Sequence, residues 1–141
     1  MQKKTTSYDI INQIADSKSP DIINSDLVQS VSFGDLIRED LKERKLNKAK
    51  LLDAICVERS YGYQILNGRR VPPRLVILRI ALFLGLGVER TQLLLNAGQK
   101  EGLFPTSRFD AVVIYALGHN YDMHRTEELL EEFQQPSLFE E

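Results

Sequence analysis

Two helix-length segments separated by a very short turn constrain this chain more than any other feature of its sequence. The first begins after Asn47, a good N-cap, and has apolar residues at positions 51, 52 and 55. The second begins around Glu58 and ends at Leu66, so only Cys56-Val57-Glu58 join the two. Helices of about eight residues connected this closely have to cross steeply, and the second can then project from the surface of a domain.

Helix-capping residues predict another helix before this pair. Ser32 can cap a helix, Asp35 can complete a capping box, and Val31 can pack onto Leu36 as a hydrophobic staple. Apolar residues follow at helical spacing, so this helix is expected to run to about Lys45.

Glycines and prolines divide the chain after the pair in the same way. Asn67-Gly68 is typical of a helix end in which the glycine takes positive φ, and Pro72-Pro73 suits the start of a new helix. The largely apolar stretch 75–86 contains Arg79 and is predicted to be a buried helix rather than a membrane span. Two helices are expected here: 74–84, ended by Gly85, and 88–97, ended by Gly98.

The flanking regions are also predicted to be helical, and no useful strand pattern occurs, so the fold class is all-α. Residues 1–30 suggest a short helix, a break at Pro20 and a short turn. Residues 105–107 open a later helix that Asp110 can help to cap, Asn120 can end it in the left-handed conformation, and Asp122 can cap a last helix to about Phe133. Residues 134–141 are expected to be frayed. The expected organisation is a partly flexible N-terminal extension (1–30), a five-helix domain (31–99) and a C-terminal helical extension (100–141).

Composition places the chain among ordinary globular proteins. It has 141 residues, 43% hydrophobic and 27% charged, which is enough for one domain with its own core. The first 19 residues have no apolar h-region, so no signal peptide is expected. Cys56 is the only cysteine, which excludes an internal disulfide. We therefore expect a cytoplasmic protein without a membrane partner.

Charge is unevenly distributed along the sequence. Residues 42–74 contain nine basic and three acidic residues, a net +6 in a chain whose total is −2, so the remainder has a net −8. Such a basic segment is typical of a surface that meets phosphates, although a solvated helix face has the same composition.

Residues 33–97 resemble, without gaps, the phage-repressor (Xre) helix-turn-helix family. The resemblance lies in three ordered segments: residues 46–51 (LNKAKL), residues 64–73 (QILNGRRVPP) and residues 84–88 (LGLGV), with Leu93-Leu94 beyond. It implies a five-helix DNA-binding domain whose third helix enters the major groove.

Three positions depart from that family's pattern. The usual small residue in the second helix is Leu52, the usual turn glycine is Cys56, and the usual branched residue in the third helix is Gly62. We expect Leu52 and Gly62 to face each other as a volume-conserving exchange. Cys56 would have to adopt positive φ if the turn keeps its usual shape.

The resemblance also implies roles for exposed residues on and around the third helix. Arginine suits guanine and glutamine suits adenine, whereas Tyr61 and Ile65 are better candidates for the core. Alternatively, Arg59 and Gln64 are ordinary surface residues. The residues expected to read bases are Glu58, Arg59, Ser60, Tyr63 and Gln64. Those expected to contact phosphates are Asn47, Lys48, Asn67, Arg69 and Arg70.

Other chemical signals are weak. His119, Asp122 and His124 form a short cluster, but Asp122 is better used as a helix cap, so no metal is expected. Gly85-Leu86-Gly87 lacks the third glycine of a phosphate loop, and no cofactor is expected. Glutamates 127, 128, 131 and 132 are interpreted as a solvated helix face. No catalytic constellation is recognisable, and we do not expect an enzyme.

The leading hypothesis is a sequence-specific transcriptional regulator whose partner is double-stranded DNA. A homodimer would let a symmetric pair read two half-sites, and the C-terminal helices offer a surface for a protein partner. The alternative is a helical interaction module, such as an antitoxin-like adaptor, that no longer reads DNA. The overall acidity, Glu58 at the reading end and the unusual pair Leu52/Gly62 favour that alternative.

Overall fold

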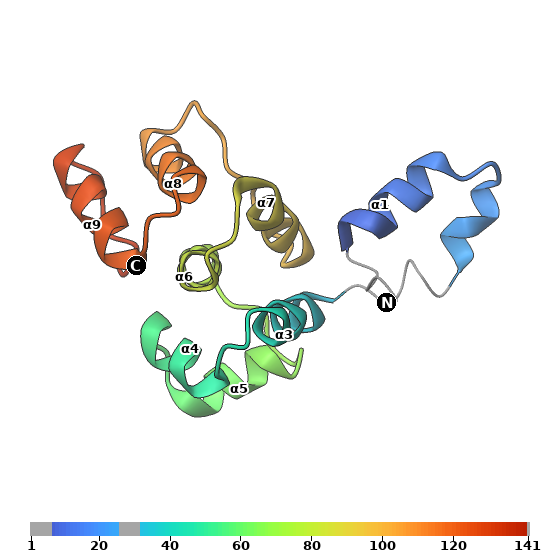
Figure 1. Cartoon of the computed structure of the whole chain (residues 1–141), viewed down its shortest axis with the longest axis horizontal. Helices are drawn as coiled ribbons and strands as arrows, with labels where there is room; N and C mark the ends of the chain where they lie inside the picture. Colours follow the sequence, from blue (N-terminus) through green and yellow to red (C-terminus); the bar gives the residue numbers. More distant parts are fainter. Residues whose placement is uncertain (1–6, 26–31, 141) are drawn as a thin grey trace.

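The computed structural model describes residues 7–25 and 32–140, and this part of the chain is entirely helical, which confirms the all-α class (Figure 1). Val31, and with it the expected staple onto Leu36, lies outside the described residues. The elements in chain order are α1 (Ser7–Asp16), the 3-10 helix η1 (Pro20–Asn24), α3 (Phe33–Glu43), α4 (Lys48–Ile55), α5 (Arg59–Leu66), α6 (Arg74–Leu84), α7 (Val88–Ala97), α8 (Arg108–Gly118) and α9 (Met123–Glu132).

Helix α6 forms the centre of the molecule. Figure 1 shows it end-on between α7, α9 and α4, and all three of these helices pack against it. Ile77, Leu78 and Ile80 on this helix are fully buried, as the apolar sequence of 75–86 predicts. Even Arg79 is only 6% exposed, and its guanidinium donates to the carbonyl of Leu138 at 3.0 Å.

Most of the predicted helix caps are confirmed. The side chains of Asn47 and Asp122 accept hydrogen bonds from the backbone N–H groups of Ala49 and Arg125. Ser32 likewise accepts from the N–H of Asp35, while the Asp35 carboxylate binds Arg38. Gly68 (φ 80°) and Asn120 (φ 57°) take the left-handed conformation that the sequence predicts, and Gly85, which ends α6 as expected, is also left-handed (φ 67°).

Asp110 has a different role from the predicted one. Ser107 provides the cap of α8, and the Asp110 carboxylate instead binds the guanidinium of Arg74 through two hydrogen bonds, of 2.8 and 3.1 Å. It also accepts from the N–H of Phe104 at 2.9 Å. Arg74 in turn donates to the carbonyls at 101 and 102. This cluster attaches the beginning of α8 to the beginning of α6.

The expectation of a frayed C-terminus is wrong for residues 134–140. Leu138 is fully buried, and Phe139 lies under the Arg79 guanidinium, 4.6 Å from the ring centroid. Glu127 accepts hydrogen bonds from the Ser137 hydroxyl (2.6 Å) and the Leu138 N–H (2.8 Å). Glu127 is therefore half-buried and structural, not part of a solvated face. Burial of Leu138, the two hydrogen bonds to Glu127 and the contacts of Arg79 together oppose the conformational entropy lost when this segment is ordered.

The N-terminal segment forms the predicted short helix and turn. Helix α1 lies beside α7, and η1 has no buried residues (Figure 1). Ile11, Ile14 and Ile23 remain exposed on them. In the described part of the chain, no helix has the length and apolarity needed to cross a membrane.

Candidate nucleic-acid interface

The connection between α4 and α5 has the tight geometry that its sequence predicts. Cys56 ends α4 in the left-handed conformation, with φ 58° and ψ 47°, and α5 begins at Arg59. Gly62 is buried against Leu52: a Cβ atom on Gly62 would lie 2.9 Å from the Leu52 Cδ1 atom and closer still to Cδ2. The two helices therefore approach closely because glycine leaves room for the leucine.

Helix α5 is attached to the core along one face and at its C-terminal end. Ile65 and Leu66 are buried, and Tyr61 packs against the core while remaining partly exposed, as expected. The Arg38 guanidinium on α3 donates to the Leu66 carbonyl, which satisfies a helix-end acceptor. Gly34 allows α3 to approach the loop after α5, since a Cβ atom on Gly34 would lie 3.0 Å from the Gly68 nitrogen.

The residues expected to read bases share the opposite face of α5 and its N-cap. Gln64 is only partly exposed, and its backbone carbonyl also accepts from the N–H groups of Arg69 and Arg70, at 2.9 and 3.2 Å. Glu58 makes no side-chain capping bond to the first turn of α5. The structure leaves exposed at this surface Glu58, Arg59, Ser60 and Tyr63.

The residues expected to contact phosphates come from two segments, one at the start of α4 and one directly after α5. Asn47 and Lys48 are exposed at the start of α4, while Asn67, Arg69 and Arg70 are exposed after α5. The side-chain oxygen Oδ1 of Asn47 caps α4 by accepting from the Ala49 N–H at 2.7 Å, so the side-chain NH2 group is the part that remains for a ligand. The turn at Gly68 and the bonds to Gln64 fix the loop that presents the two arginines.

Two of the nine basic residues between 42 and 74 have acidic partners, which sequence reasoning did not anticipate. Arg74 is engaged by Asp110, so its charge serves the fold rather than a ligand. Arg59 lies across the α4–α5 turn from Asp53, with 3.5 Å between Nη2 and Oδ1. The positions of Asp53 near the end of α4 and Arg59 at the start of α5 could have indicated this contact, because a tight turn brings the end of one helix close to the start of the next. Arg59 is exposed despite this contact, and the other exposed basic residues of the segment are Lys42, Arg44, Lys45, Lys48, Lys50, Arg69 and Arg70.

A buried polar cluster between α3 and α7 lies behind this surface. Asp40 is 3% exposed, and its Oδ2 atom lies 3.2 Å from Arg90 Nε; Glu39 lies 3.7 Å from the same guanidinium. Burial raises the pKa of Asp40 above its usual value, and the nearby Arg90 charge opposes that effect only in part. The cluster joins the helix that supports α5 to α7.

His119, Asp122 and His124, which are close together in the sequence, each interact with neighbouring residues of α8 or α9. His119 stacks on Tyr115, with 3.9 Å between ring centroids, Asp122 caps α9, and His124 lies 2.7 Å from Glu128. Among residues 7–25 and 32–140, no group of three or more histidine, cysteine or acidic side chains could hold a metal ion.

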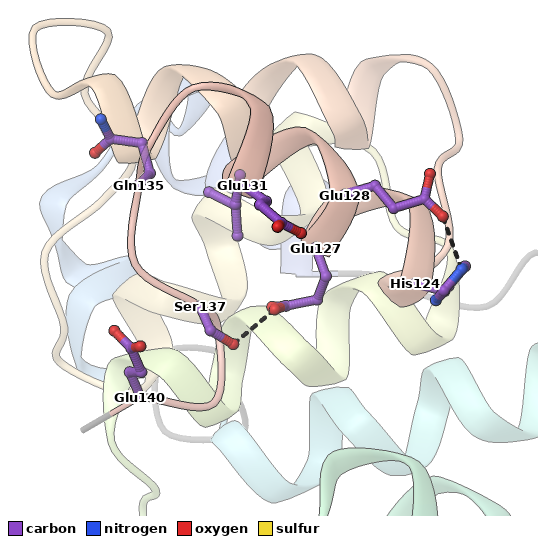
Figure 2. Close-up of a pocket in the computed structure, with 8 residues that line it drawn as sticks. His124, Glu127, Glu128, Glu131, Gln135, Ser137 and Glu140 are labelled. Carbon is purple, nitrogen blue, oxygen red and sulfur yellow. Dashed lines mark hydrogen bonds and ion pairs between the residues drawn. The ribbon is translucent and has the colours of Figure 1, made fainter.

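An acidic pocket of about 350 Å³ lies between α9 and the C-terminal segment (Figure 2). Figure 1 shows α9 and α5 on different sides of α6. The pocket's negative charge makes it unsuitable for a phosphate backbone. Its lining consists of His124, Glu127, Glu128, Leu130, Glu131, Gln135, Ser137 and Glu140.

Comparison with models of known protein families, with curated proteins and with solved structures found no match to this chain.

Proposed function

We propose that this protein is a sequence-specific DNA-binding transcriptional regulator of the phage-repressor (Xre) type. In this proposal α3–α7 form the DNA-binding domain, α4 and α5 are its helix-turn-helix, and α5 enters the major groove. One observation supports the proposal most: α5 has a polar exposed face opposite its buried face, and exposed amide and basic side chains lie at the start of α4 and directly after α5.

The chemistry of that face suits the two kinds of contact that DNA recognition requires. Arg59 can donate two hydrogen bonds to guanine, and Gln64 can pair with adenine. Lys48 at the start of α4 and Arg69 and Arg70 after α5 would bind phosphates and fix the orientation of the protein on the duplex. The backbone N–H groups of Arg69 and Arg70 bind the Gln64 carbonyl, and an arginine whose backbone is already hydrogen-bonded loses less entropy when it binds a ligand.

The first test is recovery of sheared genomic DNA from the source organism by the purified protein at about physiological salt, followed by sequencing. We expect one short sequence to be enriched by the wild-type protein and not by the Arg59→Ala/Gln64→Ala variant. Arg108→Ala is the control, because it removes an exposed arginine from the first turn of α8. Circular dichroism verifies that each variant is folded.

Retention of no DNA above background by folded wild-type protein would contradict the proposal. So would equal enrichment by the wild-type protein and the double variant, because α5 would then not be the reading helix. Binding to the enriched sequence should also weaken steeply as salt rises, since each neutralised phosphate releases counterions.

The second candidate is a helical interaction module that does not read DNA. The acidic lining of the pocket beside α9 favours it, together with Glu58 at the exposed start of α5. A protein complex formed through a helical docking surface need not show the steep salt dependence of phosphate binding.

A further inference from the structure

Two oppositely charged side chains, Asp53 and Arg59, face each other across the turn between α4 and α5. Asp53 Oδ1 and Arg59 Nη2 are 3.5 Å apart, and the side chains are 68% and 62% exposed. An exposed ion pair of this kind contributes little to stability because solvent screens it and two side chains lose freedom. The contact therefore needs a reason other than holding the fold together.

Each partner also occupies the unfavourable end of its own helix. Asp53 lies in the last turn of α4, where the backbone carbonyls already present negative charge, and Arg59 is the first residue of α5, where the N–H groups present positive charge. The first turn of α5 contains no acidic residue, and Glu58 does not cap it through its side chain. Pairing across the turn reduces both unfavourable placements, and it favours positions of the Arg59 side chain near the carboxylate.

We infer that Asp53 is a specificity-determining residue, which positions Arg59 to read a base and keeps it off the phosphate backbone. This inference rests on the proposed DNA-binding function. A guanidinium has five N–H donors, so one edge can bind the carboxylate while another donates to guanine O6 and N7. A carboxylate beside the arginine also repels phosphate oxygens, which reduces sequence-independent binding through Arg59.

Asp53→Asn tests this role because it preserves the size of the side chain while removing its charge. Glu43→Gln is the matched control, since Glu43 is also an exposed acid in the last turn of a helix, α3, within the basic segment. The measurement is equilibrium binding to the sequence enriched from genomic DNA and to an unrelated duplex, at several salt concentrations.

We expect Asp53→Asn to tighten binding to the unrelated duplex and to lower the ratio of specific to non-specific affinity by about tenfold. The salt dependence on the unrelated duplex should become steeper by about one phosphate contact, because Arg59 is then free to bind the backbone. Glu43→Gln should shift both affinities alike and leave their ratio unchanged. In an Arg59→Ala background, Asp53→Asn should no longer alter the ratio.

An unchanged ratio in Asp53→Asn overturns the inference, and so does an effect that persists without Arg59. Either result, obtained with a wild-type protein that enriches a sequence, leaves the proposed function standing. If folded wild-type protein binds no DNA, the proposed function fails, and the role of Asp53 fails with it. Because both side chains are exposed, the melting temperature of each variant should remain close to that of the wild-type protein.

Discussion

Cys56 lies in the α4–α5 turn, at the position where the family that the sequence resembles usually has a glycine. Its φ of 58° places a side chain in the left-handed region, which costs about 1–2 kcal/mol for residues other than glycine. The turn is over-determined by the packing of α4 and α5 on either side, so the residue accepts this conformation.

Cys56→Gly is therefore expected to raise the free energy of unfolding by about 1 kcal/mol, after allowance for the greater entropy of glycine in the unfolded chain. Cys56→Ala keeps the unfavourable conformation and should have little effect. Urea denaturation followed by circular dichroism measures both variants. Equal stability of the glycine and alanine variants would mean that the turn stores no strain.

Asp40 gives a prediction of pH dependence. Because burial raises its pKa in the folded protein above the ordinary value of 3.8, the folded state binds more protons than the unfolded state between these two pKa values. Stability contributed by this group therefore increases as the pH falls through the raised pKa, and this gain is complete below the unfolded value.

The measurement is the free energy of unfolding of the wild-type protein and of Asp40→Asn between pH 7 and pH 4. The stability of the wild-type protein relative to Asp40→Asn should increase as the pH falls, because the carboxylate of Asp40 can be protonated and the amide of the variant cannot. A difference that moves the other way would show that the Arg90 charge, 3.2 Å away, outweighs burial.

At the scale of secondary-structure elements, the contact between α4 and α5 depends on the exchange of size between Leu52 and Gly62. Gly62→Ile is expected to destabilise the protein by about 1–3 kcal/mol through overpacking. Leu52→Ala alone should cost about 2–5 kcal/mol by leaving a cavity. The double variant should cost less than the sum of the two, because the new side chain fills the space that the leucine leaves.

Denaturation of the wild-type protein, both single variants and the double variant completes this cycle. Additive losses, within about 0.5 kcal/mol, would indicate that the two sites do not share their space. Gly98→Ala is a useful comparison, since its Cβ atom would meet Ile77, Val71 and Phe33 rather than α4.

Sequence reasoning succeeded where the physical cause is local. The starts of α4 and α9 depend on the caps Asn47 and Asp122, and the end of α6 depends on Gly85, all within a few residues of the elements they define. The contact of Leu52 with Gly62 was predicted from the resemblance to the phage-repressor family, since these two positions depart from its usual pattern in opposite directions of size.

Long-range polar pairing was not predictable in this way. Nothing near Asp110 in the sequence indicates that its carboxylate binds Arg74, which lies 36 residues earlier. Glu127 reads as one member of a solvated acidic face, yet it accepts two hydrogen bonds from the C-terminal segment. Exposure of the expected recognition residues follows from helical periodicity, whereas the pairing of Arg59 with Asp53 depends on side-chain geometry across the turn.

At the scale of the whole molecule, two arginines of α6 connect the C-terminal helices to the rest of the chain. Arg74 binds Asp110 at the beginning of α8, and Arg79 binds the carbonyl of Leu138 after α9. A single apolar cluster extends from Phe33 on α3 to Leu138. Because this cluster is continuous, a destabilising substitution in the C-terminal segment should lower the stability of the whole molecule, which should still unfold in one cooperative transition.

Leu138→Ala tests that expectation. The Leu138 side chain is fully buried, so its truncation should lower the free energy of unfolding by about 2–5 kcal/mol. The loss should appear as a shift of one cooperative transition, measured by circular dichroism at 222 nm. Glu140→Ala, two residues later and exposed, should change stability by less than about 0.5 kcal/mol. A loss confined to a separate early transition would mean that the C-terminal segment unfolds independently. A negligible loss would restore the interpretation of a frayed end, and the acidic pocket beside α9 would then have no fixed wall.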